Sequence, residues 1–266
     1  MENQGNNSKR GGKIVLIIFS ALIVAFILYY TIMLMSAPAR KLYEIREKYG
    51  VQKTGGNTPA EKLLTDSTYL SLYKEKAFLQ SRIAMAESDS IYLTLDIPDS
   101  VANLELSGVT VHQVKLREIK LSRILRASDN YAIISMLSSP LNIVRYYATI
   151  KKEPLMIKMA PKDTSEFKPD IIPDTTDREP VNYLLEMDNS MKIYFYQDTD
   201  TSKSDKKELF FFNSADRINS CLNSLKNVVR GKVPEYKPYI KVWLPKADAK
   251  ILYRALPRKG QVAVCL

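Results

Sequence analysis

The chain has 266 residues, enough for one medium-sized domain with appendages, and 45% of them are hydrophobic, as in an ordinary globular protein. Two cysteines and one histidine are too few for a disulfide framework or a typical zinc site. The formal net charge of +10 is spread along the chain without a basic–aromatic motif, so we expect anionic partners but no nucleic acid.

An uncharged apolar run, residues 14–35, follows a polar and basic segment at residues 1–13. At ~1.5 Å per residue, a helix of this length crosses a hydrocarbon core of ~30 Å. The run is longer than the ~7–15 apolar residues of a signal peptide, which favours an uncleaved anchor; the small residues at 37–39 keep a cleaved signal peptide as the alternative. The basic segment is typical of a cytoplasmic tail, so we expect a single-pass inner-membrane protein with residues 36–266 on the periplasmic side.

Residues 36–57 are charged and then glycine-containing, which is typical of a juxtamembrane linker. Thr58, followed by proline and then by Glu61, predicts the start of an amphipathic helix within residues 58–90. Apolar residues recur along it at helical spacing, as in a coiled-coil stalk that makes a homodimer or in a helix packed on the domain that follows. We expect the packed helix, because the stripe is short and Lys76 occupies one of its core positions.

From Ile91 the hydrophobic period changes to two, which is typical of β-strands. The pattern predicts a β-meander that opens a domain covering residues 91–266. The expected strands cover residues 91–97, 101–106 and 109–121. His112 lies in the third of them and is expected on its less buried face as a plain strand residue, because the neighbouring sequence offers it no catalytic or metal-binding partner.

Further elements are expected before the C-terminal end. Residues 181–197 predict a hairpin, and residues 209–212 predict a strongly apolar strand. A helix is expected over residues 215–230, and its apolar face includes Cys221, which we therefore place in the core. Residues 160–180 are rich in proline, aspartate and threonine without a period, so they predict an exposed loop.

Residues 237–266 predict a strand, a helix, a turn and a final strand. The first strand, residues 239–244, alternates aromatic and β-branched side chains, and Pro245 ends it because proline has no backbone N–H. A short helical pattern follows, then a turn at Gly260 and the final strand, residues 261–266.

This order resembles the C-terminal end of the L,D-transpeptidase catalytic domain, in which a Ser-His-Gly-Cys-Val-Arg-Leu-Pro strand precedes a helix carrying Asp-Ala, a Pro–Gly turn and a Val-rich strand. The meander at residue 91 is similar to the opening of that domain. The resemblance implies an α+β protein, in which a transmembrane helix and an amphipathic helix precede a mainly antiparallel β-sandwich with peripheral helices. The matching positions are Val242, Leu244, Pro245, Asp248, Ala249, Leu252, Pro257, Gly260 and Val262.

The residues that carry the family's chemistry are replaced in this chain. Lys241 stands at the position of the nucleophilic cysteine, Tyr239 at the histidine and Trp243 at the arginine, while Tyr196-Gln197 stands where a second strand has His-Gly. Acyl transfer through a thioester needs a thiolate, a base and an oxyanion hole, and these replacements remove the first two. The resemblance thus implies no catalytic residue here, but a vestigial groove at Tyr196, Tyr239, Lys241 and Trp243 that binds peptidoglycan or a wall-synthesis partner.

Two alternatives remain at this point. An active L,D-transpeptidase-like enzyme would use Cys221 or Cys265 in a rearranged site, whereas an envelope scaffold would bind no ligand. The sequence has no phosphate-binding loop, HExxH, CxxC or paired-carboxylate motif, so we expect no cofactor and no metal. Outside the cytoplasm, the two cysteines could also form a disulfide.

Overall fold

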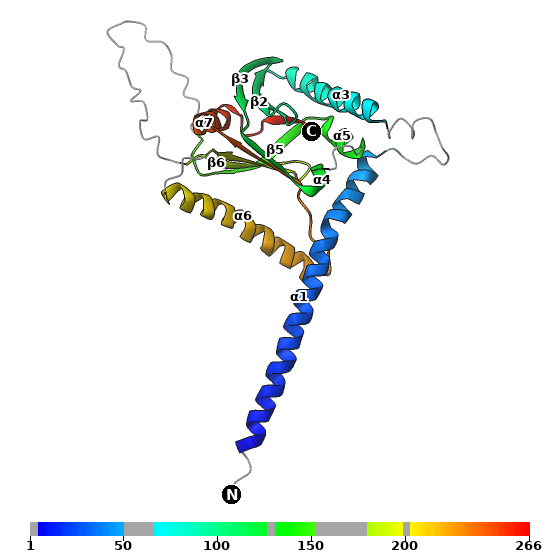
Figure 1. The fold of residues 1–266 in the computed structure, drawn as a ribbon, viewed down its shortest axis with the longest axis vertical. Coiled ribbons are helices and arrows are strands. Elements are labelled where there is room, and N and C mark those ends of the chain that lie inside the picture. The colour runs from blue at the N-terminus through cyan, green and yellow to red at the C-terminus, as the bar shows by residue number, and fades with distance from the viewer. Residues whose placement is uncertain (1–4, 51–65, 127–130, 153–179, 199–202) are drawn as a thin grey trace, which may run out of the picture. The chain divides into compact units, whose positions relative to one another are not determined.

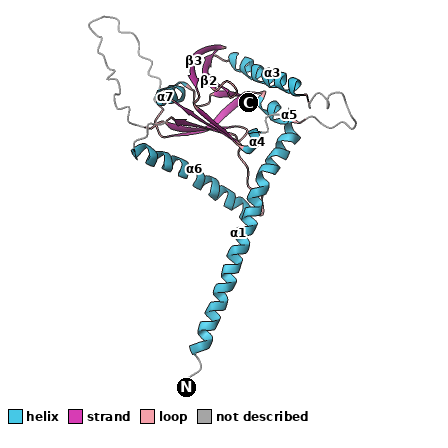
Figure 2. Ribbon diagram, viewed as in Figure 1, coloured by secondary structure: helices cyan, strands magenta, loops and turns pink. Residues whose placement is uncertain are grey.

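The computed structural model describes residues 5–50, 66–126, 131–152, 180–198 and 203–266. The chain divides into two compact units. One unit contains residues 1–44 and 216–236, and the other contains residues 45–215 and 237–266. In the part of the chain that is described, the first unit is helical and the second holds the β-sheet (Figure 1; Figure 2).

One long helix, α1 (Gly5–Tyr49), contains the apolar run (Figure 1). The helix is long and apolar enough to cross a membrane, and none of its most apolar stretch is buried. It continues past the run, through Pro38, so the first part of the predicted linker is helical. The helix ends at Gly50, where an added Cβ would lie 2.2 Å from the carbonyl oxygen of Arg46, too close for any other residue without a shift of the backbone.

The second unit is built on a nine-stranded sheet with the order β3-β2-β1-β9-β5-β6-β7-β8-β4. Most neighbouring strands are antiparallel, whereas β1 pairs in parallel with β9 and β7 pairs in parallel with β8. The unit is therefore α+β as expected, with a mixed sheet rather than a purely antiparallel one. The strands are β1 (Tyr92–Asp96), β2 (Val101–Leu106), β3 (Val109–Lys115), β4 (Glu118–Leu121), β5 (Leu141–Ala148), β6 (Asn182–Met187), β7 (Lys192–Gln197), β8 (Tyr239–Leu244) and β9 (Gln261–Cys265).

The described helices that accompany the sheet are α3 (Ser67–Ala86), α4 (Arg123–Arg126), α5 (Tyr131–Leu137), the first half of α6 (Lys203–Val229) and α7 (Lys246–Ala255). Among them, α3 and α6 are longer than the others. One face of the sheet carries the fully buried side chains of β7 and β8, and α7 packs on it through Tyr253, whose ring lies 5.0 Å from that of Tyr183. Burial and the neighbouring Tyr253 raise the pKa of Tyr183 well above its ordinary value.

The predicted meander is present as β1, β2 and β3, but its third strand is shorter than expected. Residues 118–121 leave the meander as β4 and pair with β8 at the opposite edge of the sheet. The last strand, β9, returns to pair with the first, with Val262 beside Leu93. The two ends of the domain therefore meet within the sheet. The hairpin predicted at residues 181–197 is also found, as β6 and β7.

The helix α3 is the described part of the amphipathic helix, and the predicted start at Thr58 lies outside the described residues. Asp66 caps its first turn, and the helix packs on the β domain as expected. Leu70 and Ala77 are buried against Ile134 of α5. The homodimer through residues 58–90 stays a prediction, and the large apolar side chains that α3 leaves exposed are Leu72, Leu79 and Ile83.

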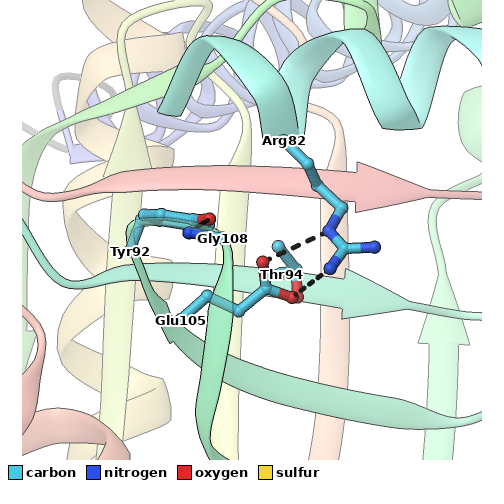
Figure 3. Close-up of polar contacts among 5 residues, drawn as sticks. All are labelled: Arg82, Tyr92, Thr94, Glu105 and Gly108. Carbon is cyan, nitrogen blue, oxygen red and sulfur yellow. Dashed lines mark hydrogen bonds and ion pairs between the residues drawn. The ribbon is translucent and has the colours of Figure 1, made fainter. Parts of the chain in front are cut away.

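A buried carboxylate links α3 to the meander (Figure 3). Glu105 of β2 has no exposed surface, and Arg82 reaches it from α3 with an Nη2–Oε1 distance of 3.0 Å and an Nε–Oε2 distance of 3.2 Å. The Thr94 hydroxyl donates to the same carboxylate at 3.0 Å, and the Gly108 N–H donates to the Tyr92 hydroxyl at 3.0 Å. Burial raises the pKa of Tyr92, and the Glu105 carboxylate adds to that rise.

One continuous helix, α6, covers the region where a strand and a shorter helix were expected. The strand prediction for residues 209–212 is wrong, because tertiary packing overrides the strand propensity of three consecutive phenylalanines. Phe212 is buried against the β domain, whereas Phe210 and Phe211 are exposed. The expected burial of Cys221 is also wrong, since its side chain is exposed.

Candidate functional site

Three of the four predicted groove residues lie on β8, where alternation of side chains divides the strand between the two faces of the sheet. Ile240 and Val242 point into the core and have no exposed surface. Tyr239, Lys241 and Trp243 occupy the opposite face and are half-buried. The strand therefore presents an amine between two aromatic rings.

The neighbouring strand brings the fourth predicted residue to the same place. In the parallel pairing of β7 with β8, Tyr194 lies beside Lys241 and Tyr196 lies beside Trp243. The rings of Tyr196 and Trp243 stack with their centroids 5.0 Å apart and their planes at 27°. The structure thus brings together Tyr196, Tyr239, Lys241 and Trp243.

Tyrosine rings surround the amine of Lys241. Its Nζ lies 5.1 Å from the ring centroid of Tyr194, 5.3 Å from that of Tyr239 and 6.0 Å from that of Tyr196. At these distances, the negative face of an aromatic ring attracts a cation. The sequence reading missed Tyr194. The alternation of Tyr194 and Tyr196 puts both rings on one face, but only the pairing of β7 with β8 puts them beside Lys241.

A second lysine, which the sequence reading also missed, approaches from the other side of β8. Lys120 of β4 lies opposite Lys241 in the antiparallel register, and its Nζ is 4.8 Å from the centroid of the Trp243 ring. Lys120 also makes an exposed ion pair with Glu118 at 2.7 Å. One ammonium group therefore lies over the single tryptophan of the chain, and a second lysine, Lys241, lies opposite Lys120 in the strand pairing.

The first half of α6 covers one side of this cluster. Phe212 packs edge-on against Tyr196 at 6.2 Å, and the Tyr196 hydroxyl donates to Oδ1 of Asn213 at 2.8 Å. Tyr194 and Tyr196 are buried and pack beneath the more exposed side chains of the site. The side chains that a ligand can reach are those of Lys120, Tyr239, Lys241 and Trp243, which we call the Lys241 surface.

Neither cysteine belongs to the Lys241 surface, and both thiols are free. Cys265 ends β9 and is half-buried. Burial, reinforced by the Asp96 carboxylate, raises the pKa of this thiol to about 11. A thiol with that pKa is almost fully protonated near pH 7, whereas a cysteine nucleophile reacts as the thiolate.

His112 has a partner that the local sequence did not reveal. Its Nε2 lies 3.2 Å from Oδ1 of Asp248, which is 136 residues away on α7. The expectation of a less buried face is wrong, because the neighbouring Val111 is 63% exposed and His112 shares its face with the buried Val114. A carboxylate at this distance orients the imidazole ring, so the pair ties β3 to α7.

Lys152 forms a second lysine–tyrosine cluster. Its Nζ lies 5.6 Å from the ring centroid of Tyr146 and 5.1 Å from that of Tyr253, and it donates to the backbone carbonyl of Leu256. Burial lowers the pKa of Lys152, and the nearby Arg258 adds to that effect. No local motif marks this lysine, because its partners come from β5 and α7.

Among the described residues, no three His, Cys, Asp or Glu side chains are grouped so that they could hold a metal ion. Comparison with protein-family models, curated proteins and solved structures finds no match. The function is therefore inferred from the geometry and chemistry of the site itself.

Proposed function

We propose that this chain is a single-pass membrane protein whose β domain lies outside the cytoplasmic membrane and binds a cell-wall component without catalysis. The observation that carries the proposal is the convergence of Tyr196, Tyr239, Lys241 and Trp243 on one face of the sheet, with an amine where the resemblance places a nucleophilic sulfur. We further propose that the domain is a relative of the L,D-transpeptidase catalytic domain. Two features support this relation: the strand–helix–turn–strand order at its C-terminal end and the pairing of β9 with β1.

The chemistry of the Lys241 surface suits an anionic ligand. Lys120 and Lys241 lie opposite each other on neighbouring strands, and the Lys120 ammonium lies over the Trp243 ring, so a carboxylate can bind an ammonium group while an apolar part of the ligand packs on the indole. The stem peptides of peptidoglycan offer such carboxylates, and so do acidic segments of envelope proteins. The net charge of +10 favours approach to either polymer.

The test is co-sedimentation of the full-length chain, held in detergent, with isolated sacculi. We expect the chain to sediment with sacculi, and we expect Trp243→Ala combined with Lys241→Ala to weaken binding by about tenfold or more, the loss typical of removing a buried interface anchor. The matched control is Ile251→Ala, because Ile251 is a partly exposed apolar residue of α7 outside the Lys241 surface. The proposal is wrong if the unaltered chain does not sediment with sacculi.

An envelope scaffold without a ligand is the second candidate function. It is favoured by the internal contacts of the site, since the amine of Lys241 already lies among rings of its own chain and Phe212 covers one edge of Tyr196. In that case, sacculi would not sediment the chain, but cross-linking in cells would still capture a protein partner. The two candidates therefore predict different results for sedimentation with sacculi.

A further inference from the structure

The helical unit contains an apolar surface that the proposed function does not use. The second half of α6 leaves Ile218, Leu222, Leu225 and Val229 exposed, between 38% and 69% for each side chain. Their spacing of four, three and four residues puts them in one stripe along the helix. A soluble helix normally buries such a stripe, so its exposure indicates that another surface covers it in the cell.

The position of α6 against α1 indicates what covers this stripe. The second half of α6, from residue 216, and residues 5–44 of α1 belong to the same unit, and the end of α6 lies against α1 partway along its length (Figure 1). The Tyr30 hydroxyl of α1 lies 3.9 Å from Sγ of Cys221 on α6. Tyr30 is inside the apolar run, about 7.5 Å along the axis from Met35 at ~1.5 Å per residue.

We propose that the second half of α6 lies in the outer interface of the membrane, with the stripe from Ile218 to Val229 facing lipid. This inference rests on the proposed membrane span. If α1 crosses the bilayer at residues 14–35, a helix in contact with Tyr30 lies at the boundary between headgroups and acyl chains. Amphipathic helices that lie on membranes sit about 5–10 Å into this boundary, which agrees with the depth of Tyr30.

The charges beside the contact fit the same surface. Just beyond the apolar run, α1 and the segment after α6 line a cleft of about 370 Å³. Arg40, Lys41 and Lys232 bring three cations to it, against the two carboxylates of Glu44 and Glu235. Arg40 and Lys41 both form ion pairs with Glu44, so the lining keeps a small positive excess. Cations at this level are attracted to anionic headgroups. The apolar stripe and the basic cleft would thus contact adjacent layers of one leaflet.

The test measures the depth of single labels in the full-length chain, reconstituted in phosphatidylcholine–phosphatidylglycerol vesicles. In a Cys221→Ser, Cys265→Ser background, a fluorophore is attached at Leu222→Cys. The matched control is Ser220→Cys, which is also exposed but lies roughly opposite on the helix at ~100° per residue. We expect a lipid-borne shallow quencher to remove most of the emission at residue 222 and little at residue 220.

A third label, at Ile23→Cys in the middle of the apolar run, separates this inference from the proposed anchor. Quenching of residue 23 by a deep quencher, without quenching of residue 222 by the shallow one, overturns the inference and leaves the anchor intact. Absence of quenching at residue 23 overturns the anchor itself. If Leu222→Cys instead forms a disulfide between two copies and stays unquenched, a second copy covers the stripe and the lipid proposal is wrong.

Discussion

Side chains of the same type have different environments in this molecule, and those environments set their chemistry. Lys241 lies among tyrosine rings whose faces attract its ammonium group, whereas Lys152 is half-buried beside Arg258 and has a lowered pKa. Cys221 is exposed, whereas the thiol of Cys265 has its pKa raised by burial. Substitutions at single residues can therefore test separately whether a side chain binds a ligand or reacts as a nucleophile.

The thiol of Cys265 should be a poor nucleophile. Its pKa of about 11, against an ordinary 9.0, leaves about a hundredfold less thiolate near pH 8 than at an unperturbed cysteine. In a Cys221→Ser variant, we expect alkylation of Cys265 by iodoacetamide to be slower than that of a free cysteine by about tenfold or more, because the higher nucleophilicity of a more basic thiolate offsets part of the loss. The rate should rise up to about pH 11. Intact mass spectrometry measures the rate.

The same variant tests the enzyme alternative. Incubation with a carbapenem should give no adduct at Cys265, because thioester formation needs a thiolate. A Cys221→Ser chain that gains the mass of the carbapenem, and loses this adduct when Cys265 is also replaced, would contradict the non-catalytic proposal. The Cys265→Ser chain examines Cys221 in the same way.

Removal of Arg82 alone should destabilise the β domain, because it leaves the fully buried Glu105 carboxylate without its cation. Arg82→Met leaves the Glu105 carboxylate with only the Thr94 hydroxyl among the contacts in Figure 3, so we expect the free energy of unfolding to fall by about 3 kcal/mol. Urea unfolding followed by the fluorescence of Trp243, the single tryptophan, measures this loss.

An exposed ion pair provides the control for this measurement. Arg117 pairs with Asp198, but its side chain is 64% exposed, so Arg117→Met should cost at most ~1 kcal/mol. The double variant Arg82→Met, Glu105→Leu should regain part of the stability lost by Arg82→Met, because it removes the isolated charge. Equal losses for Arg82→Met and Arg117→Met would show that burial does not set the strength of this pair.

At the scale of elements, the sequence predicted most of the strands and helices that have a clear hydrophobic period. The alternating runs gave β6, β7 and β8, and the spacing after Pro245 gave α7. The failure at α6 has a physical cause: Leu209–Phe212 is too short for a period to separate a strand from a buried helix segment. Only the packing of Phe212 on the β domain decides it.

The helical assignment of this segment predicts an unequal response of its phenylalanines. Phe212→Ala should lower the free energy of unfolding by about 3–5 kcal/mol, because it empties space against Tyr147 and Tyr196. Phe211→Ala should change stability by less than ~0.5 kcal/mol, since Phe211 is exposed. In the predicted strand, Phe210 and Phe212 would share one face, so a large loss for Phe210→Ala would favour the strand. Urea unfolding measures all three.

At the scale of the whole molecule, long-range pairing is what the sequence could not predict. Nothing in residues 118–121 identifies β8 as their neighbour, and the contact of His112 with Asp248 follows from the fold alone. In the candidate site, too, some residues could be predicted from a local pattern and others only from the pairing of strands. Tyr239, Lys241 and Trp243 follow from alternation along one strand, whereas Tyr194 and Lys120 join them only through pairing with β7 and β4. Local periodicity determines which face of the sheet a side chain occupies, whereas the order of the strands determines which side chains lie next to it.

The direction of insertion decides whether the Lys241 surface can meet the cell wall at all. The basic segment before residue 14 favours a cytoplasmic N-terminus, although Arg40 and Lys41 follow the apolar run on its other side. Alkaline phosphatase fused after Leu266 should be active in cells, because it folds only outside the cytoplasm, and a β-galactosidase fusion at the same place should be inactive. Deleting residues 14–35 gives the control, in which both activities should reverse. An inactive phosphatase with an active galactosidase in the full-length fusions would place the β domain in the cytoplasm, where no peptidoglycan is available to it.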